Sequence, residues 1–301
     1  MEKKNNIAVY TAIFGDYDKL IIPEKEIEGC DFYCFTDNKK LQSDFYKIIQ
    51  VEGEFSDPTR NARKIKILSH KYLPEYEYTL WIDANICFRE FDVKKMFNNF
   101  LANHDIAIHK HNVRDCVYNE FSYCTEIEID SPAIMANQIV RYIKEDYPIN
   151  NGLVETGVLF RRNTKSIKKI NEDWWNEIKN GSKRDQLSIC YVIWKNKIDY
   201  FMIEKSIRKG NLFYIENHSS NNYPKRARTF NFNELEKKIL EIEGGICKKC
   251  YIEEKNSNKI QTINCQLKEM DQILKKKEAE INYMKSSKFW KLRNLYLKIR
   301  K

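Results

Sequence analysis

The sequence predicts an α/β domain over residues 1–245 with a mostly parallel central sheet, followed by a helical coiled-coil tail. Short apolar runs rich in β-branched and aromatic residues alternate with segments of helical periodicity, which is typical of parallel sheets. The runs end in polar residues, as expected where a parallel sheet carries a site at its carboxyl edge. An apolar heptad register begins only near the end of the chain, and it predicts the tail.

Each expected strand is a short apolar run that a turn-forming or polar residue closes. The first, residues 7–14, is β-rich throughout and ends at Gly15-Asp16, as buried parallel strands do. The third, residues 78–83, delivers a carboxylate at its end. The other expected strands occupy residues 31–36, 106–109 and 158–160.

Helices are expected where apolar residues recur at helical spacing after a capping residue. One follows Asp57-Pro58, because Asp57 can cap it and Pro58 fits its first turn. This helix is expected to end at Pro74. Two more helices are expected, one containing residues 174–179 and one running through residues 187–194.

The net charge of +9 is concentrated at the carboxyl end of the chain. Residues 285–301 contain seven Lys and Arg and no acid, so residues 1–284 carry only 9 − 7 = +2. A nucleic-acid-binding body would carry its own basic stripe. The charge pattern therefore predicts no nucleic-acid partner for the main domain.

The tail is predicted to have three parts. Residues 246–258 are polar and are expected to be a linker. Residues 259–284 repeat apolar side chains at heptad spacing, which predicts a short coiled coil and a homo-oligomer, or else a single helix folded back on the domain. Residues 285–301 set Phe289 and Trp290 among cations, which favours a basic amphipathic helix on an anionic membrane surface over a solvated, frayed end.

Composition narrows the cellular location. No run approaches the roughly 20 apolar residues of a membrane-spanning helix, and no apolar signal core follows the lysines at residues 3–4. Nine scattered cysteines suit a reducing compartment, and the lone Cys247-Lys-Lys-Cys250 pair lacks the partners of a zinc site. The expected location is the cytoplasm, with peripheral attachment to the inner face of the cell membrane.

The motif Asp83-Ala-Asn85 carries the main chemical signal. A hydrophobic strand here delivers Asp-Xaa-Asn into a turn, an arrangement with which nucleotide-sugar enzymes hold Mg²⁺ or Mn²⁺ across a diphosphate. The departing nucleoside diphosphate gains negative charge, which a metal or nearby cations must offset. The alternative is that Asp83 only forms a turn or caps a helix.

The helix upstream of this motif is strongly cationic. Arg60, Arg63 and Lys64 lie three and four residues apart and share a face, and Lys66 follows three residues after Arg63. A cationic helix that leads into a strand ending in an acid suits diphosphate binding. The alternative is a solvated surface helix.

Six segments, in this order, resemble the TOD/MUCI-type glycosyltransferase-like domain, formerly a domain of unknown function. They are VYTAIFGDYDKL (9–20), DPTRNARKIKILSHKYLPEYEYTLWIDANI (57–86), RDCVYNE (114–120), NNGLVETGVLFRRN (150–163), WW (174–175) and KRDQLSICYVIWK (183–195). The resemblance covers roughly residues 7–220. A more distant resemblance is to the glycogenin and lipopolysaccharide-galactosyltransferase group.

The resemblance implies a GT-A fold, in which a Rossmann-like nucleotide half joins an acceptor half. It also implies a glycosyltransferase that moves a sugar from a nucleotide-sugar donor to a surface-polysaccharide, lipopolysaccharide, lipid-linked or other glycan acceptor. The alternative is a catalytically silent scaffold that binds nucleotide sugars or glycans in a polysaccharide-synthesis complex. The motivation for this alternative is Asn85, which stands where the distant relatives have a second Asp.

By the same resemblance, the donor site draws on several segments. The residues implied in nucleotide-sugar binding are Thr11, Gly15, Tyr17, Arg60, Arg63, Lys66, Asp83 and Gln186. Asp83 and Asn85 would form the metal corner, with His218 as a third ligand or as an ordinary loop histidine. Because a carboxamide brings no charge, metal binding is expected to be weak, and catalysis by Arg and Lys without metal is the alternative.

Two acids are implied as candidate catalytic residues. Asp185 and Gln186 would lie beside the sugar or the acceptor, although Asp185 could instead cap the helix that follows. Glu155 is the other acid expected to reach an acceptor hydroxyl. If the reaction inverts configuration, one of the two acts as general base, and Asp185 is favoured. Arg114 and Asp115 would order the acceptor side or form a structural ion pair.

Overall fold

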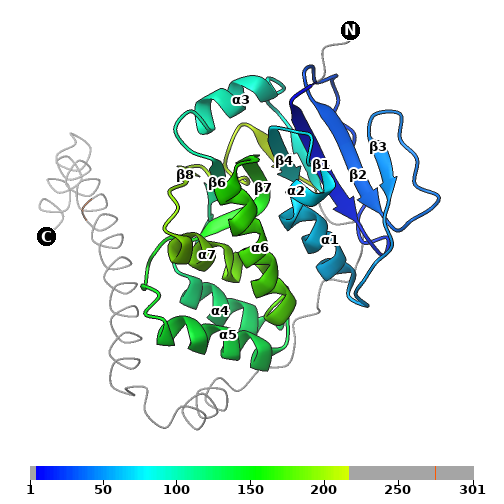
Figure 1. The fold of residues 1–301 in the computed structure, drawn as a ribbon. Helices are drawn as coiled ribbons and strands as arrows, with labels where there is room; N and C mark the ends of the chain where they lie inside the picture. The colour runs from blue at the N-terminus through cyan, green and yellow to red at the C-terminus, as the bar shows by residue number, and fades with distance from the viewer. Residues whose placement is uncertain (1–4, 217–274, 276–301) are drawn as a thin grey trace, which may run out of the picture. The chain divides into compact units, whose positions relative to one another are not determined.

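A computed structural model describes residues 5–216 and residue 275. Its centre is a seven-stranded sheet in the order β3-β2-β1-β4-β7-β6-β8 (Figure 1). β7 pairs antiparallel with both of its neighbours, and every other pair in this sheet is parallel. The strands are β1 (Ile7–Ile13), β2 (Asp31–Thr36), β3 (Lys47–Gln50), β4 (Tyr78–Ile82), β6 (Ile106–Lys110), β7 (Val154–Arg162) and β8 (Phe201–Ile203). The predicted α/β class and mostly parallel sheet are therefore confirmed.

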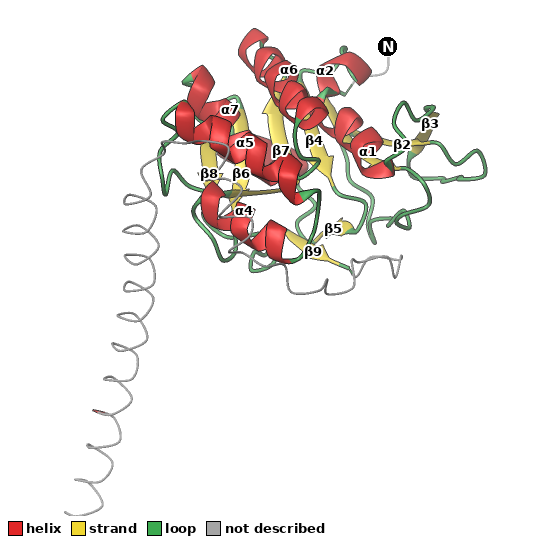
Figure 2. Ribbon diagram, turned by 90° about the horizontal axis from the view of Figure 1, so that it is seen from below, coloured by secondary structure: helices red, strands yellow, loops and turns green. Residues whose placement is uncertain are grey.

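A second, antiparallel pair of strands, β5 (Ile86–Phe88) and β9 (Phe213–Ile215), lies next to the turn that follows β4. The helices are α1 (Pro58–Ile67), α2 (Ser69–Tyr72), α3 (Val93–Phe100), α4 (Val117–Glu126), α5 (Pro132–Lys144), α6 (Lys165–Asn180) and α7 (Ile189–Asn196), with the 3₁₀ turn η1 (Asp185–Leu187). The helices α1, α2, α6 and α7 cover one face of the sheet (Figures 1 and 2). None of the helices in the described residues is long and apolar enough to span a membrane.

The two faces of the sheet bury different side chains, because successive residues of a strand point to opposite sides. Val9, Leu80 and Phe160 belong to an apolar core shared with α3 and the β5–β9 pair. On the other face, Tyr10 and Trp81 contact Lys66 of α1.

The helix predicted after Asp57 is present, but it is divided. The Asp57 side chain accepts a hydrogen bond from the Thr59 amide at 2.9 Å, and Pro58 occupies the first turn, as predicted. α1 ends at Leu68, and the short α2 follows and ends before Pro74. The break at Leu68 was not predicted.

Arg161 fixes the end of α1 to the sheet. Its guanidinium is buried and donates to the carbonyls of Lys66 and Ile67 at 2.7 and 3.0 Å, and to Asn171 Oδ1 of α6 at 2.9 Å. A cation suits the carboxyl end of a helix, where carbonyl groups lack partners. The contact sets the position of Lys66 on the sheet.

The predicted tail lies outside the described residues. This applies to the linker at 246–258, the coiled coil at 259–284, the amphipathic helix at 285–301, the Cys247–Cys250 pair and His218. The description of the α/β domain, predicted to extend over residues 1–245, ends at residue 216.

Candidate functional site

A cleft of about 620 Å³ opens at the carboxyl ends of β1 and β4, the edge at which the sequence predicted a site. Residues 12–14 and 83–86 line it from these two strands and the turn after β4. Because β7 runs in the opposite direction, its first residues, including Glu155, lie at the same edge. The rest of the wall comes from α1, η1, the segment after β6, α4 with the residues that follow it, the loop after β8, and β9.

The loop after β1 forms one end of the cleft. Gly15 has φ of +63°, and a Cβ there would lie 2.8 Å from Pro58 Cγ, so glycine is required for the loop to approach α1. Tyr17 lines the cleft, as expected of a nucleotide loop. Thr11 is buried inside β1 and is not part of the wall, and its hydroxyl has no hydrogen-bond partner among the described residues.

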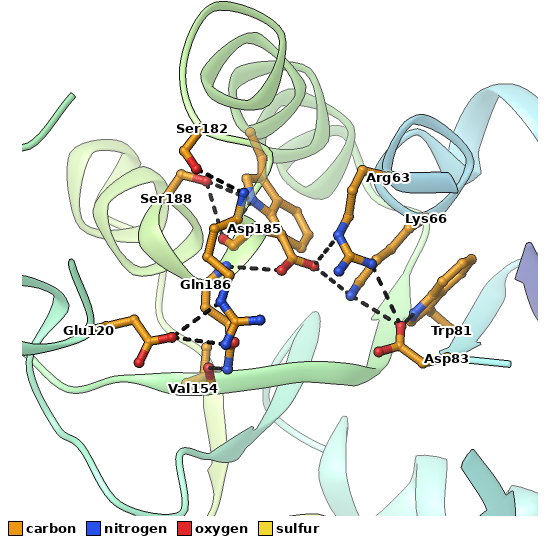
Figure 3. A network of polar contacts seen from close by, with 12 residues as sticks. Arg63, Lys66, Trp81, Asp83, Glu120, Val154, Ser182, Asp185, Gln186 and Ser188 are labelled. Atoms are coloured by element: carbon orange, nitrogen blue, oxygen red, sulfur yellow. Dashed lines mark hydrogen bonds and ion pairs between the residues drawn. The ribbon is translucent and has the colours of Figure 1, made fainter. Parts of the chain in front are cut away.

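A cluster of two cations and two carboxylates lies at the centre of the site, and we call Arg63, Lys66, Asp83 and Asp185 the Asp83 corner (Figure 3). Lys66 Nζ lies 2.6 Å from Asp185 Oδ2 and 3.4 Å from Asp83 Oδ1. Arg63 Nε lies 3.1 Å from Asp185 Oδ2, and Arg63 Nη1 lies 3.9 Å from Asp83 Oδ1. The sequence predicted these four residues at the site but not their pairing.

Burial differs sharply within the Asp83 corner. The side chains of Lys66 and Asp185 are 0% and 1% exposed, whereas those of Arg63 and Asp83 are 18% and 32% exposed. Trp81 supports the corner from below, since its Nε1 donates to Asp83 Oδ1 at 2.7 Å and its ring lies 5.5 Å from Lys66 Nζ. The corner thus has an inaccessible ion pair and an accessible one.

The electrostatics make Asp185 a poor proton acceptor. Burial alone would raise the pKa of Asp185, but Arg63 and Lys66 hold this pKa well below its ordinary value. Asp185 also does not cap the following helix: α7 begins after Ser188, and the Asp185 carboxylate faces Lys66. The alternative of a simple helix cap is therefore wrong.

The four cations of α1 do not all reach the same partners. Arg63 and Lys66 enter the Asp83 corner, so the alternative of a solvated helix face does not hold for them. Arg60 donates to the carbonyls of Ile178 and Gly181 at the end of α6, and it is not part of the cleft wall. Lys64 pairs with Glu54. The structure therefore does not bring Arg60 to the predicted donor site.

The turn after β4 was the predicted metal corner. Asp83 Oδ1 already accepts a hydrogen bond from Trp81 and faces two cations, and the Asn85 amide donates to the Glu216 carbonyl at 3.0 Å. Within residues 5–216 and 275, no three His, Cys, Asp or Glu side chains are grouped as ligands for a metal ion. The described residues thus group no third ligand of these types with Asp83, and the divalent cation expected at Asp83 and Asn85 stays a prediction.

A second buried carboxylate, whose role the sequence did not reveal, binds two arginines of the opposite wall. Glu120 of α4 is fully buried, and it accepts from Arg114 Nε at 2.6 Å and Arg184 Nη2 at 2.9 Å. Burial would raise the pKa of Glu120, but Arg184 and Arg114 keep it below its ordinary value. Arg114 thus pairs with Glu120, whereas its predicted partner Asp115 is exposed.

Glu155 and Gln186 complete the wall between these two clusters. The Glu155 carboxylate accepts from the amides of Asn112 and Ile207 at 3.3 and 2.8 Å, and burial raises its pKa above the ordinary value. Gln186 donates through Nε2 to the Val154 carbonyl at 3.1 Å (Figure 3). Both residues line the cleft, and their expected place beside the sugar or the acceptor stays a prediction.

Comparison with known families identifies the domain that carries this cleft. Residues 1–218 match the family model described as TOD1/MUCI70, glycosyltransferase-like domain. The chain belongs to this family. The resemblance inferred from the sequence is confirmed, and every residue that lines the cleft lies within the matched range.

Two curated relatives of the TOD1/MUCI70 family come from Arabidopsis thaliana. The protein named alkaline ceramidase TOD1 is 23% identical over 231 residues, which covers 63% of this chain and 48% of that protein. The protein named probable hexosyltransferase MUCI70 is 24% identical over 228 residues, which covers 64% of this chain and 38% of that protein. The chain therefore spans about half or less of the length of these relatives.

Proposed function

We propose that the protein is a glycosyltransferase of GT-A architecture that moves a sugar from a nucleotide-sugar donor to a polysaccharide, lipopolysaccharide or lipid-linked acceptor. The observation that carries the proposal is the Asp83 corner, where Arg63 and Asp83 are accessible at the carboxyl ends of β1 and β4 in a mostly parallel sheet. Membership in a glycosyltransferase-like family and similarity to a probable hexosyltransferase support it.

Arg63 is the cation we assign to the donor phosphates. It lies within ion-pair distance of two carboxylates, yet its guanidinium makes no hydrogen bond among the described residues, and its Nε is a buried donor without an acceptor. A buried unsatisfied donor costs roughly 1–3 kcal/mol. A diphosphate bound beside Asp83 would supply the missing acceptors. Tyr17 and the apolar residues of the β1 loop would then contact the nucleoside.

We assign the proton acceptor to Glu155 and a positioning role to Asp185. In the transfer, the bond from the anomeric carbon to the phosphate oxygen breaks, and the nucleoside diphosphate leaves with the electron pair. The acceptor oxygen bonds to the anomeric carbon, and its hydroxyl proton passes to Glu155. A raised pKa makes Glu155 a better base than Asp185, whose pKa is held low by its cations.

Arg63 and Lys66 are proposed to compensate the charge of the departing diphosphate. The Mg²⁺ or Mn²⁺ ion that the sequence predicted at Asp83 and Asn85, with His218 as a third ligand, stays a prediction. The tail likewise stays a proposal: a coiled coil that forms homo-oligomers, and a basic helix that holds the protein on the inner face of the membrane.

The test is incubation of the full chain with a panel of nucleotide sugars, with and without Mn²⁺, followed by measurement of nucleoside diphosphate release and donor binding. We expect one donor to bind and be turned over, and Arg63→Gln to weaken its binding. Lys169→Gln, which removes an exposed pair with Asp173 on α6, is the matched control. If no donor binds while a reference enzyme is active in the same assay, the proposal fails.

The alternative of a catalytically silent scaffold has one observation in its favour: both carboxylates of the Asp83 corner are already paired with cations. Asp83→Ala separates the two functions, because a scaffold would keep its effect on surface polysaccharide and an enzyme would lose it. Since one relative is named an alkaline ceramidase, ceramide hydrolysis is measured in the same samples. Hydrolysis without any glycosyl transfer would overturn the proposal.

A further inference from the structure

Charged side chains are unevenly distributed in the cleft, and the excess of positive charge lies away from the Asp83 corner. That corner holds two cations and two carboxylates, so it is balanced. The opposite wall is lined by three guanidinium groups and Glu155, and the buried Glu120 pairs with two of these guanidinium groups without lining the cleft itself, so the group has an excess of 3 − 2 = +1. We call this group the arginine wall, and it consists of Arg114, Glu120, Glu155, Arg184 and Arg208. If Glu155, with its raised pKa, takes up a proton, the excess becomes +2.

The arginine wall keeps unused hydrogen-bond donors. Arg114 uses Nε and Arg184 uses Nε and Nη2 to bind Glu120. The other guanidinium N–H groups of these two residues have no hydrogen-bond acceptor among residues 5–216 and 275, and Arg208 forms no ion pair there. Because Glu120 holds two of these guanidinium groups in fixed positions, a bound anion would not have to order them.

Apolar side chains lie in the same part of the cleft. Val113 is 74% exposed and Tyr123 is 40% exposed, and both line the cleft together with Ile127 and Ile129. The Arg114 guanidinium lies 4.0 Å from the Tyr123 ring centroid. A wall for a neutral sugar would present polar groups to its hydroxyls, whereas this one presents cations beside aliphatic side chains.

We propose that the arginine wall binds the phosphate that joins the sugar to the hydrocarbon in a lipid-linked acceptor, so that a hydroxyl of that sugar is the nucleophile, with Val113, Tyr123 and the two isoleucines contacting the first part of the hydrocarbon chain. This inference rests on the proposed function, because it places the acceptor in the half of the cleft opposite the donor. It selects one class, a phosphate joined to hydrocarbon, from the acceptors considered above. An acidic but water-soluble glycan would satisfy the cations and leave the aliphatic surface uncovered.

The experiment measures binding of farnesyl phosphate to the full chain by titration calorimetry below the micelle concentration. Farnesol tests the hydrocarbon alone, inorganic phosphate tests the anion alone, and a trigalacturonate tests an acidic glycan. We expect farnesyl phosphate to bind more tightly than the other three ligands. Arg208→Gln and Arg114→Gln should each weaken it about tenfold, as loss of a charged hydrogen-bond donor does.

Controls separate the arginine wall from other basic surfaces. Arg208 is exposed, so its substitution leaves no buried charge unpaired, whereas Arg114→Gln still leaves Glu120 with Arg184. Arg162→Gln, which removes a half-exposed pair with Asp105 outside the cleft, should not change binding. Substitution of Lys291 and Arg293 in the tail tests whether the basic tail, rather than the cleft, takes up the lipid.

Nucleoside diphosphate binding to the unsubstituted protein distinguishes two kinds of failure. If a nucleotide binds and farnesyl phosphate does not, or binds equally well to the Arg114 and Arg208 variants, the inference is overturned and the proposed function stands. Trigalacturonate or inorganic phosphate binding as tightly as farnesyl phosphate also overturns it. If no nucleotide binds, the proposed function fails and the inference fails with it.

Discussion

Lys66 Nζ lies 2.6 Å from Asp185 Oδ2, although the two residues are 119 positions apart in the chain. Both side chains are withdrawn from solvent, and the pair joins the end of α1 to the start of η1. A buried pair of this kind adds little over an apolar pair, but removal of one partner leaves a buried charge uncompensated. The pair therefore positions two segments of the cleft relative to each other.

Lys66→Met should destabilise the fold by about 3–5 kcal/mol, because Asp185 loses its nearest cation while buried. The free energy of unfolding in urea measures the effect. Lys169→Met, which breaks an exposed pair, should change that free energy by less than about 1 kcal/mol. Equal losses in the two variants would show that Lys66 and Asp185 do not form a buried pair.

The pH dependence of stability should reflect the low pKa of Asp185. A carboxyl group with a lowered pKa in the folded state stabilises the protein above its unfolded pKa of about 3.9. This contribution is lost as the pH falls from there toward the lower folded value. Urea unfolding between pH 6 and pH 3 should show the loss, and Asp185→Asn should flatten the acid part of the curve. An unchanged slope in the variant would contradict the assignment.

Glu155→Gln should lower the transfer rate by about a hundredfold or more, because the acceptor hydroxyl loses its base. The rate of the unsubstituted enzyme should fall as the pH drops through the raised pKa of Glu155, since only the carboxylate accepts a proton. The variant should lack this acidic limb. A rate profile that keeps the limb in Glu155→Gln would assign the base elsewhere.

Arg63→Gln and Arg60→Gln compare two arginines of the same helix. Arg63→Gln should weaken donor binding about tenfold, because it removes a charged group at the Asp83 corner. Arg60→Gln should lower stability by about 1–3 kcal/mol instead, since it leaves two carbonyls at the end of α6 without their donor. Donor titrations and urea unfolding on both variants separate the two effects. Weaker donor binding in Arg60→Gln at unchanged stability would show that Arg60 contributes to the donor site.

Arg161→Met should cost about 2–4 kcal/mol of unfolding free energy and also weaken donor binding. The first effect follows from the loss of buried hydrogen bonds at the end of α1, and the second from displacement of Lys66. Arg162→Met, at the next position, removes a partly exposed pair with Asp105 and a hydrogen bond to the Leu101 carbonyl, neither of which involves α1, and is the control. If donor binding survives in Arg161→Met, Arg161 does not position the corner.

Local sequence pattern predicts much of the fold because the relevant signals are short-ranged. The apolar run of β1, the Asp57-Pro58 start of α1 and the strand that ends at Asp83 each depend on neighbouring residues, and each was predicted. The reversed direction of β7 was not predicted, because strand direction depends on a crossover that no local pattern encodes.

The sequence predicted which residues form the site, but it did not predict which of them form ion pairs with each other. Asp83, Arg63, Lys66 and Asp185 were singled out by residue type and family resemblance. The contacts of Asp185 with the two cations of α1 join segments more than a hundred residues apart, so spacing could not reveal them. The burial and pairing of Glu120 were not predicted for the same reason. A glutamate on an amphipathic helix usually faces solvent, and only the fold brings Arg184 to it.

Arg184 and Asp185 are consecutive residues whose side chains are held by opposite walls of the cleft. A single peptide bond thus connects the Arg184–Glu120 ion pair to the Asp185–Lys66 ion pair. A ligand that binds at the Asp83 corner or at the arginine wall and displaces these two residues therefore changes the geometry of the other group as well. The expected kinetic result is an ordered addition of the two substrates, in which the second is captured well only after the first has arrived.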